Sequence, residues 1–74
     1  MNTLGFYREK ALLTKTKLSK LSQVPRSTVI YLEQGIKHPT VSTATKLALT
    51  ISRCLNTPIA PDQLFSKFHG VHHE

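Results

Sequence analysis

The sequence predicts an all-α protein in which five short helices pack into one compact domain. Apolar residues recur at three- and four-residue spacing along most of the chain, as they do in amphipathic helices. Apolar–polar alternation is weak, and no Asn-Gly or Asp-Gly pair marks a hairpin turn. The chain has 74 residues, which suffices for one small domain with a modest core.

The first helix is expected to begin at Leu4. Tyr7, Ala11 and Leu12 follow at helical spacing and extend one apolar stripe. Leu13 closes this segment. The stripe therefore predicts a helix that includes Leu12.

The second helix is expected to begin after Thr14, whose hydroxyl can accept a hydrogen bond from a free N–H of the first turn. It is short, because the segment 23–25 contains Pro25 and breaks it. Its apolar and small positions are Leu18, Leu21 and Ser22.

The third helix is expected from Pro25 to Gln34. Proline suits the first turn of a helix, where its missing N–H costs nothing. Gly35 can end the helix because glycine readily adopts a positive φ. The inward positions are Val29 and Leu32, with Thr28 beside them.

A loop over 36–39 precedes the fourth helix, which either Thr40 or Ser42 can cap. This helix has the clearest apolar stripe in the chain, and the segment 56–58 ends it at a proline. The stripe consists of Ala44, Leu47, Ala48, Ile51, Cys54 and Leu55.

Pro61 can open a last short helix that carries Leu64, Phe65 and Phe68. The predicted domain covers 1–68, and 69–74 are expected to form a flexible tail.

Positive charge is concentrated in one half of the chain. Ten Lys and Arg residues against four Asp and Glu give a net charge of +6. Residues 1–37 contain seven basic and two acidic residues, whereas 38–74 contain three basic and two acidic ones. A basic half suggests a polyanionic partner, usually nucleic acid. The alternative is a charge that serves solubility alone.

The composition argues against an enzyme and against a cofactor. A single cysteine, Cys54, excludes an internal disulfide framework, and its place on the apolar stripe favours a core residue over a nucleophile. No acidic pair suits acid–base catalysis, and no glycine-rich phosphate loop is present. His69, His72 and His73 could bind a metal weakly, but an ordinary tail is the stronger interpretation.

No membrane span or signal peptide is apparent in the sequence. The expected location is therefore the cytoplasm, in association with the nucleoid, without a membrane partner.

The most informative feature is the pair of short helices joined by the tight break before Pro25. Such a pair can hold one helix across a nucleic-acid backbone while the next enters the major groove. The stretch from Val24 to Gly35 (Val-Pro-Arg-Ser-Thr-Val-x-x-Leu-Glu-x-Gly) is the most specific part, and looser matches extend over about residues 4–65. Those looser matches are Leu4, Tyr7, Arg8, Leu13, Thr14, Lys15, Leu18, Ser19, Pro39, Thr40, Asp62, Gln63, Leu64 and Phe65. In these residues the chain resembles the phage repressor and Cro type of helix-turn-helix DNA-binding domain, also called Xre-like.

This resemblance implies a lambda-repressor-like domain whose helix-turn-helix comprises the second and third helices. The third would be the recognition helix, with Arg26, Ser27, Ile30 and Tyr31 facing base edges. An arginine can grip guanine O6 and N7 with two hydrogen bonds, and Ile30 can touch a thymine methyl. Alternatively, Arg26 is a solvated charge, and Ile30 and Tyr31 are buried against the first helix.

The resemblance also implies contacts to the DNA backbone. The start of the second helix would attract a phosphate through its free N–H groups and its dipole. The family usually has glutamine at the position of Lys15, where lysine can still neutralise a phosphate. The implied backbone contacts are Thr14, Lys15, Thr28, Gln34, Lys37 and His38. Lys17 and Lys20 are interpreted as a solvated helix face.

Arg8 and Glu33 match a pair that the family joins by a salt bridge, which would orient the recognition helix. The sequence departs from the family at Leu12, where glycine is common, and at Gln23, which stands at the usual glycine of the turn between the second and third helices. A positive φ is often needed at this turn position.

The first functional hypothesis is a sequence-specific, double-stranded DNA-binding regulator, such as a Cro-like repressor of a phage or mobile element. It would bind a pseudo-palindrome as a homodimer. The second is an antirepressor or antitoxin-like module that captures a phage or host regulator, since fold does not fix function. Ile30 and Tyr31 make the recognition face more apolar than that of most DNA-reading proteins, and Phe65 and Phe68 could anchor a partner helix.

Overall fold

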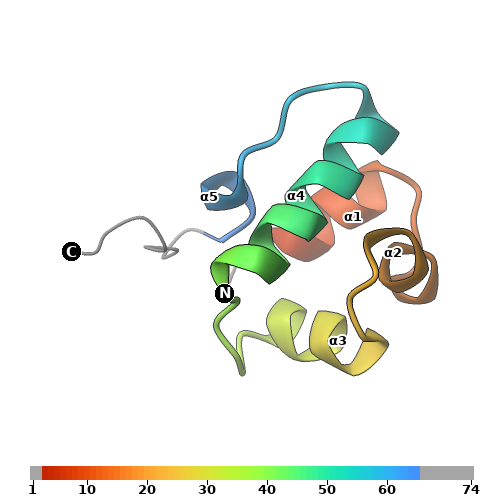
Figure 1. The fold of residues 1–74 in the computed structure, drawn as a ribbon. Coiled ribbons are helices and arrows are strands. Elements are labelled where there is room, and N and C mark those ends of the chain that lie inside the picture. The colour runs from red at the N-terminus through yellow and green to blue at the C-terminus, as the bar shows by residue number, and fades with distance from the viewer. Residues whose placement is uncertain (1–2, 66–74) are drawn as a thin grey trace.

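The computed structural model describes residues 3–65, and this part of the chain is all-α, as the sequence predicts. Figure 1 shows the arrangement of its helices. They are α1 (Leu4–Lys10), α2 (Lys15–Ser22), α3 (Arg26–Gln34), α4 (Val41–Leu55) and α5 (Pro61–Leu64).

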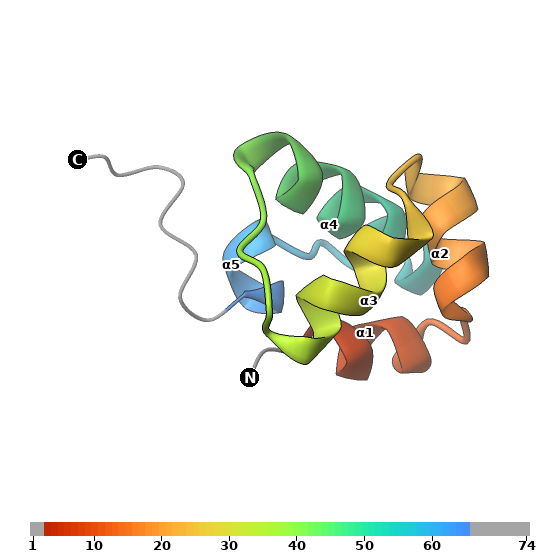
Figure 2. The same ribbon diagram turned by 90° about the horizontal axis from the view of Figure 1, so that it is seen from below.

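The longest helix, α4, has 15 residues and packs against α1, α2 and α5. α3 packs against α2 and α1 and forms the lower edge of the molecule in Figure 1. Viewed from below, α3 lies in front of the other helices (Figure 2). One side of α3 is therefore free of the rest of the fold.

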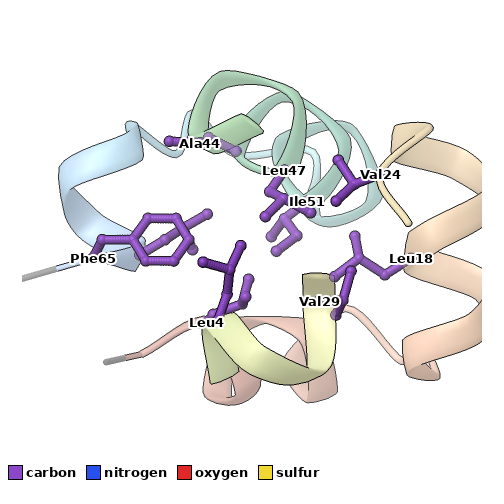
Figure 3. Packing of buried hydrophobic residues seen from close by; sticks show 11 residues of the cluster. Leu4, Leu18, Val24, Val29, Ala44, Leu47, Ile51 and Phe65 are labelled. Carbon is purple, nitrogen blue, oxygen red and sulfur yellow. The ribbon is translucent and has the colours of Figure 1, made fainter. Parts of the chain in front are cut away.

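A single apolar core fixes the opposite side of α3 (Figure 3). Val29 and Leu32 are its inward residues, as predicted, and both are essentially fully buried. Burying one such side chain contributes about 1.5–3 kcal/mol, so rotating α3 about its axis would be costly. The core consists of Leu4, Leu18, Val24, Val29, Leu32, Ala44, Leu47, Ala48, Ile51, Leu64 and Phe65.

The predicted helix ends are largely confirmed. Thr14 Oγ1 accepts a hydrogen bond from the Lys17 amide at 3.0 Å. Of the two candidates for α4, Thr40 is the cap, because its Oγ1 accepts from the Thr43 amide at 3.1 Å. Gly35 ends α3 with a φ of 76°.

The turn between α2 and α3 is tight and locally hydrogen-bonded. Gln23 adopts the left-handed conformation (φ 61°), so the position does require the positive φ that glycine usually supplies. Ser19 Oγ donates to the Val24 carbonyl at 2.6 Å, and the Val24 amide donates to the Ser19 carbonyl at 3.2 Å. Pro25 is the N-cap residue of α3. The helix itself therefore begins at Arg26, one residue later than predicted.

Leu12 is not on the buried stripe of α1, so that prediction is wrong. α1 ends at Lys10, and Leu12 lies in the following turn with a φ of 61° and 92% of its surface exposed. The chain must reverse between α1 and α2, and a left-handed residue achieves this while directing the side chain into solvent.

The prediction that Cys54 is a core residue is also wrong, because its side chain is exposed. Cys54 lies on the flank of the α4 stripe, one turn after Thr50, and the fully buried positions end at Ile51. Leu21, on the predicted stripe of α2, is likewise about half exposed.

The two ends of the described chain are tied together. Thr3 donates its amide to the Leu64 carbonyl at 3.1 Å, and its hydroxyl lies within hydrogen-bonding distance of the carbonyls of Gln63 and Leu64. Phe68, the predicted boundary after residue 68, and the predicted tail at 69–74 lie outside the described residues. Within 3–65, no helix combines the length and apolar character that a membrane crossing requires.

Candidate nucleic-acid interface

The solvent-facing side of α3 carries polar and aromatic side chains. Arg26, Ser27, Tyr31 and Gln34 are exposed, as predicted for a surface that contacts a ligand. Ile30 lies between them in helical spacing but is half-buried. Tyr31 is not buried against α1, since 43% of its surface is exposed.

Arg26 is tied to α2. Its Nε–H donates to Thr16 Oγ1 at 3.0 Å, which joins the first residue of α3 to the first turn of α2. Both side chains are exposed. The four N–H groups on the Nη atoms are not used by this bond, so Arg26 keeps donors that can face a ligand.

The start of α2 combines free backbone N–H groups with positive charge. Thr14 is exposed, although its hydroxyl oxygen already accepts the capping hydrogen bond. Lys15 follows and is half-buried. Helix N-termini favour anions, and this one is adjacent to Arg26 through Thr16.

The far end of α3 carries a second cationic group. Lys37 Nζ lies 6.0 Å from the centroid of the Tyr31 ring, a cation–π geometry. His38 and Gln34 are exposed at the same end of the helix, whereas Thr28 is half-buried on its flank. The predicted backbone contacts thus fall at both ends of α3 rather than in one cluster.

Arg8 and Glu33 form the predicted salt bridge between α1 and α3. Arg8 Nε and Nη2 donate to the two carboxylate oxygens of Glu33 at 2.5 and 3.2 Å. Only 11% of each side chain is exposed. Arg8 Nη1 also donates to the Leu13 carbonyl at 2.8 Å, so the same guanidinium holds the turn between α1 and α2.

These contacts favour the charged form of Arg8. The hydrogen bonds with Glu33 raise the pKa of the Arg8 guanidinium above its ordinary value, and burial opposes this shift only in part. An arginine side chain is charged around neutrality in any environment, so the raised pKa shows that the folded protein favours this charge and does not decide it.

Gly5 allows α1 to approach this pair closely. A Cβ at this position would lie 3.1 Å from Glu33 Oε1, which is tighter than an ordinary van der Waals contact. A side chain at this position would therefore push against the carboxylate that Arg8 holds, and the Glu33 oxygen would have to move by a few tenths of an ångström.

Sequence reasoning missed three partners of the arginines, the first of which is Glu9, whose carboxylate lies 3.6 Å from Arg8 Nη2. Thr16 was not assigned a role, and its pairing with Arg26 spans ten residues. The Leu13 carbonyl was also missed, because backbone acceptors carry no sequence signal. For Thr16, the available signal was a hydroxyl in the first turn of the helix preceding the recognition helix.

Among residues 3–65, no group of three or more His, Cys, Asp or Glu side chains is arranged to hold a metal ion. The candidate histidines of the tail, His69, His72 and His73, lie outside the described residues.

A family model described as helix-turn-helix matches residues 6–60 of the chain. The matched segment begins within α1 and ends just before α5, and it contains both helices of the candidate interface. The chain belongs to the helix-turn-helix family of the Cro type. This is a family of DNA-binding domains of transcription regulators. Comparisons with curated proteins and with solved structures find no match.

Proposed function

We propose that this helix-turn-helix domain is a sequence-specific regulator that inserts α3 into the major groove of double-stranded DNA. The observation that carries the proposal is the two-sided character of α3. Val29 and Leu32 fix one side in the core, while the other side presents exposed polar groups. A recognition helix needs both properties, since base contacts require fixed orientation and free donors.

Arg26, Ser27, Ile30 and Tyr31 read bases in this proposal. Arg26 grips a guanine, for which an arginine provides two parallel N–H donors. Ser27 serves as donor or acceptor, and the exposed part of Ile30 contacts a thymine methyl. Tyr31 offers its hydroxyl to a base or a phosphate.

Thr14, Lys15, Thr28, Gln34, Lys37 and His38 contact the DNA backbone in the same proposal. The positive charge of residues 1–37 supports these contacts, because the helix-turn-helix lies within that half. Neutralising phosphates releases counterions and makes binding depend steeply on salt.

The regulator acts as a homodimer on half-sites about one helical turn, or ~34 Å, apart. We infer a cytoplasmic, nucleoid-associated Cro-like repressor of a phage or mobile element, because the helix-turn-helix family model matches residues 6–60 and the matching residues resemble the phage repressor and Cro type.

Selection of bound duplexes from a random library, followed by titration of the best sequence at 50–200 mM salt, tests the proposal. We expect one preferred, two-fold symmetric sequence whose affinity falls by orders of magnitude over this range. Sedimentation of the complex checks for two chains per duplex. Equal affinity for all duplexes, or absence of binding, would contradict sequence-specific regulation.

A second candidate is an antirepressor or antitoxin-like module that captures a partner regulator. The half-buried Ile30 beside the partly exposed Tyr31 ring supports it, because aromatic and aliphatic groups anchor protein interfaces. Phe65 does not support it, since its side chain belongs to the core with only 4% exposed. Co-elution with a regulator encoded nearby, without any sequence preference on DNA, would favour this candidate.

A further inference from the structure

We propose that Thr16 is a positioning residue that holds the Arg26 guanidinium in the orientation needed to grip guanine. This inference rests on the proposed function and adds to it a determinant of base preference outside α3. The observation that carries it is the hydrogen bond from Arg26 Nε to Thr16 Oγ1 at 3.0 Å.

The bond decides which edge of the guanidinium remains free. An arginine has five N–H donors in a planar fork and can present two parallel N–H groups from either of two edges. One edge comprises Nε and Nη2, and the other comprises Nη1 and Nη2. Because Thr16 occupies the Nε–H of Arg26, only the end-on edge of Nη1 and Nη2 can grip the O6 and N7 of a guanine.

Thr16 is itself held in place by the packing of α2 on α3. Leu18 of α2, Val24 of the turn and Val29 of α3 are all buried in the shared core. The distance between the first turn of α2 and the start of α3 is therefore fixed by the fold. A long arginine side chain normally loses much rotamer freedom on binding, and a bond made beforehand reduces that loss.

Thr16→Val tests the inference, because it removes the hydroxyl but keeps the β-branched shape. Thr16→Ser keeps the hydroxyl and serves as the conservative variant. Thr45→Val makes the same chemical change at an exposed position of α4 and serves as the matched control. Each variant is run through the random-duplex selection, and its preference for guanine is measured with single-base substitutions in the selected site.

We expect Arg26→Ala to abolish the preference for guanine at one position of each half-site. Thr16→Val should lower the same preference about three- to tenfold, within the range that one bidentate pair contributes. Thr16→Ser and Thr45→Val should leave it unchanged. Adding Thr16→Val to Arg26→Ala should have no additional effect, because the two residues act through one contact.

The outcomes separate this inference from the proposed function. If Arg26→Ala abolishes the guanine preference and Thr16→Val does not reduce it, the inference is wrong and the proposed function stands. If Thr16→Val weakens all sequences equally, Thr16 contacts the backbone and the inference is also wrong. If the wild-type protein selects no sequence, both fail.

The rate at which the Arg26 Nε–H exchanges with solvent, measured by NMR in the DNA-free protein, gives an independent test. Thr16→Val should accelerate this exchange severalfold, whereas Thr45→Val should not. Identical exchange rates in wild-type and Thr16→Val proteins would overturn the inference, because the bond would then not hold the guanidinium.

Discussion

Two arginines tie α3 to its neighbours, and they differ in almost every physical respect. Near the end of the helix, Arg8 of α1 binds Glu33 with both side chains 11% exposed. At its beginning, Arg26 makes a hydrogen bond to Thr16 of α2, and both side chains are exposed.

This difference between the two arginines shows how one helix can be fixed in the fold and still have side-chain donors available for a ligand. Arg8 donates hydrogen bonds to the Glu33 carboxylate and to the Leu13 carbonyl, inside the protein. Arg26 commits one donor and keeps the rest for a ligand. A buried charge left without its partner is strongly destabilising, whereas an exposed group that loses a partner is solvated by water.

Breaking the buried tie should have the largest effect. Glu33→Ala leaves the nearly buried Arg8 guanidinium with the exposed Glu9 carboxylate, 3.6 Å away, as its remaining acidic partner. We therefore expect the free energy of unfolding to fall by about 3 kcal/mol. Urea denaturation measures this change. Lys17→Ala, at an exposed position of α2, is the control and should change little. Equal losses in the two variants would contradict the structural assignment of the pair.

Breaking the exposed tie should leave stability almost unchanged and affect DNA binding instead. We expect Arg26→Ala to change the free energy of unfolding by less than about 0.5 kcal/mol. Discrimination between guanine and the other bases should fall by about 1–3 kcal/mol. A urea midpoint lowered as much as that of Glu33→Ala would remove the contrast between the two arginines.

Lys37 sharpens the comparison, since it is exposed like Arg26 but is assigned to phosphate. We expect Lys37→Ala to weaken binding to all duplexes alike and to reduce the slope of log affinity against log salt by about 1. Lys46→Ala, on the exposed side of α4, is the control for net charge. A change of base preference in Lys37→Ala would show that the side chain reads sequence.

The smallest effect is expected in the turn that Arg8 holds through the Leu13 carbonyl. Leu12→Gly relieves the left-handed strain at φ 61°, so the free energy of unfolding should rise by about 0.5–1 kcal/mol. Leu21→Gly in α2 is the control and should lower it, because glycine weakens a helix interior. A loss of stability in Leu12→Gly would show that the leucine side chain makes stabilising contacts.

The features that the sequence predicted correctly depend on local chemistry. Thr14 and Thr40 cap helices because a hydroxyl and a free N–H lie within one turn. Gly35 ends α3 because a positive φ suits glycine. The Arg8–Glu33 bridge is not local, and it followed from the family resemblance rather than from spacing.

The errors arose where periodicity was extended past a helix end or past its neighbours. Leu12 continues the stripe of α1 in sequence, but the chain has already turned. Cys54 continues the apolar stripe of α4 in sequence, but it lies on the flank of the last turn of that helix, where its side chain is exposed. Periodicity marks one face of a helix and does not say how far other elements cover it. For the same reason, the pairing of Thr16 with Arg26 could not be foreseen without the packing of α2 on α3.

The contacts of Thr3 with the end of α5 have a mechanical consequence. They join positions 61 residues apart in the chain, so a pulling force applied at positions 3 and 65 would load these contacts first. α3 lies between positions 3 and 65 in the sequence, but the force passes directly through the Thr3 contacts and not through this helix. The helix proposed to read DNA is thereby shielded from strain transmitted through the ends of the domain.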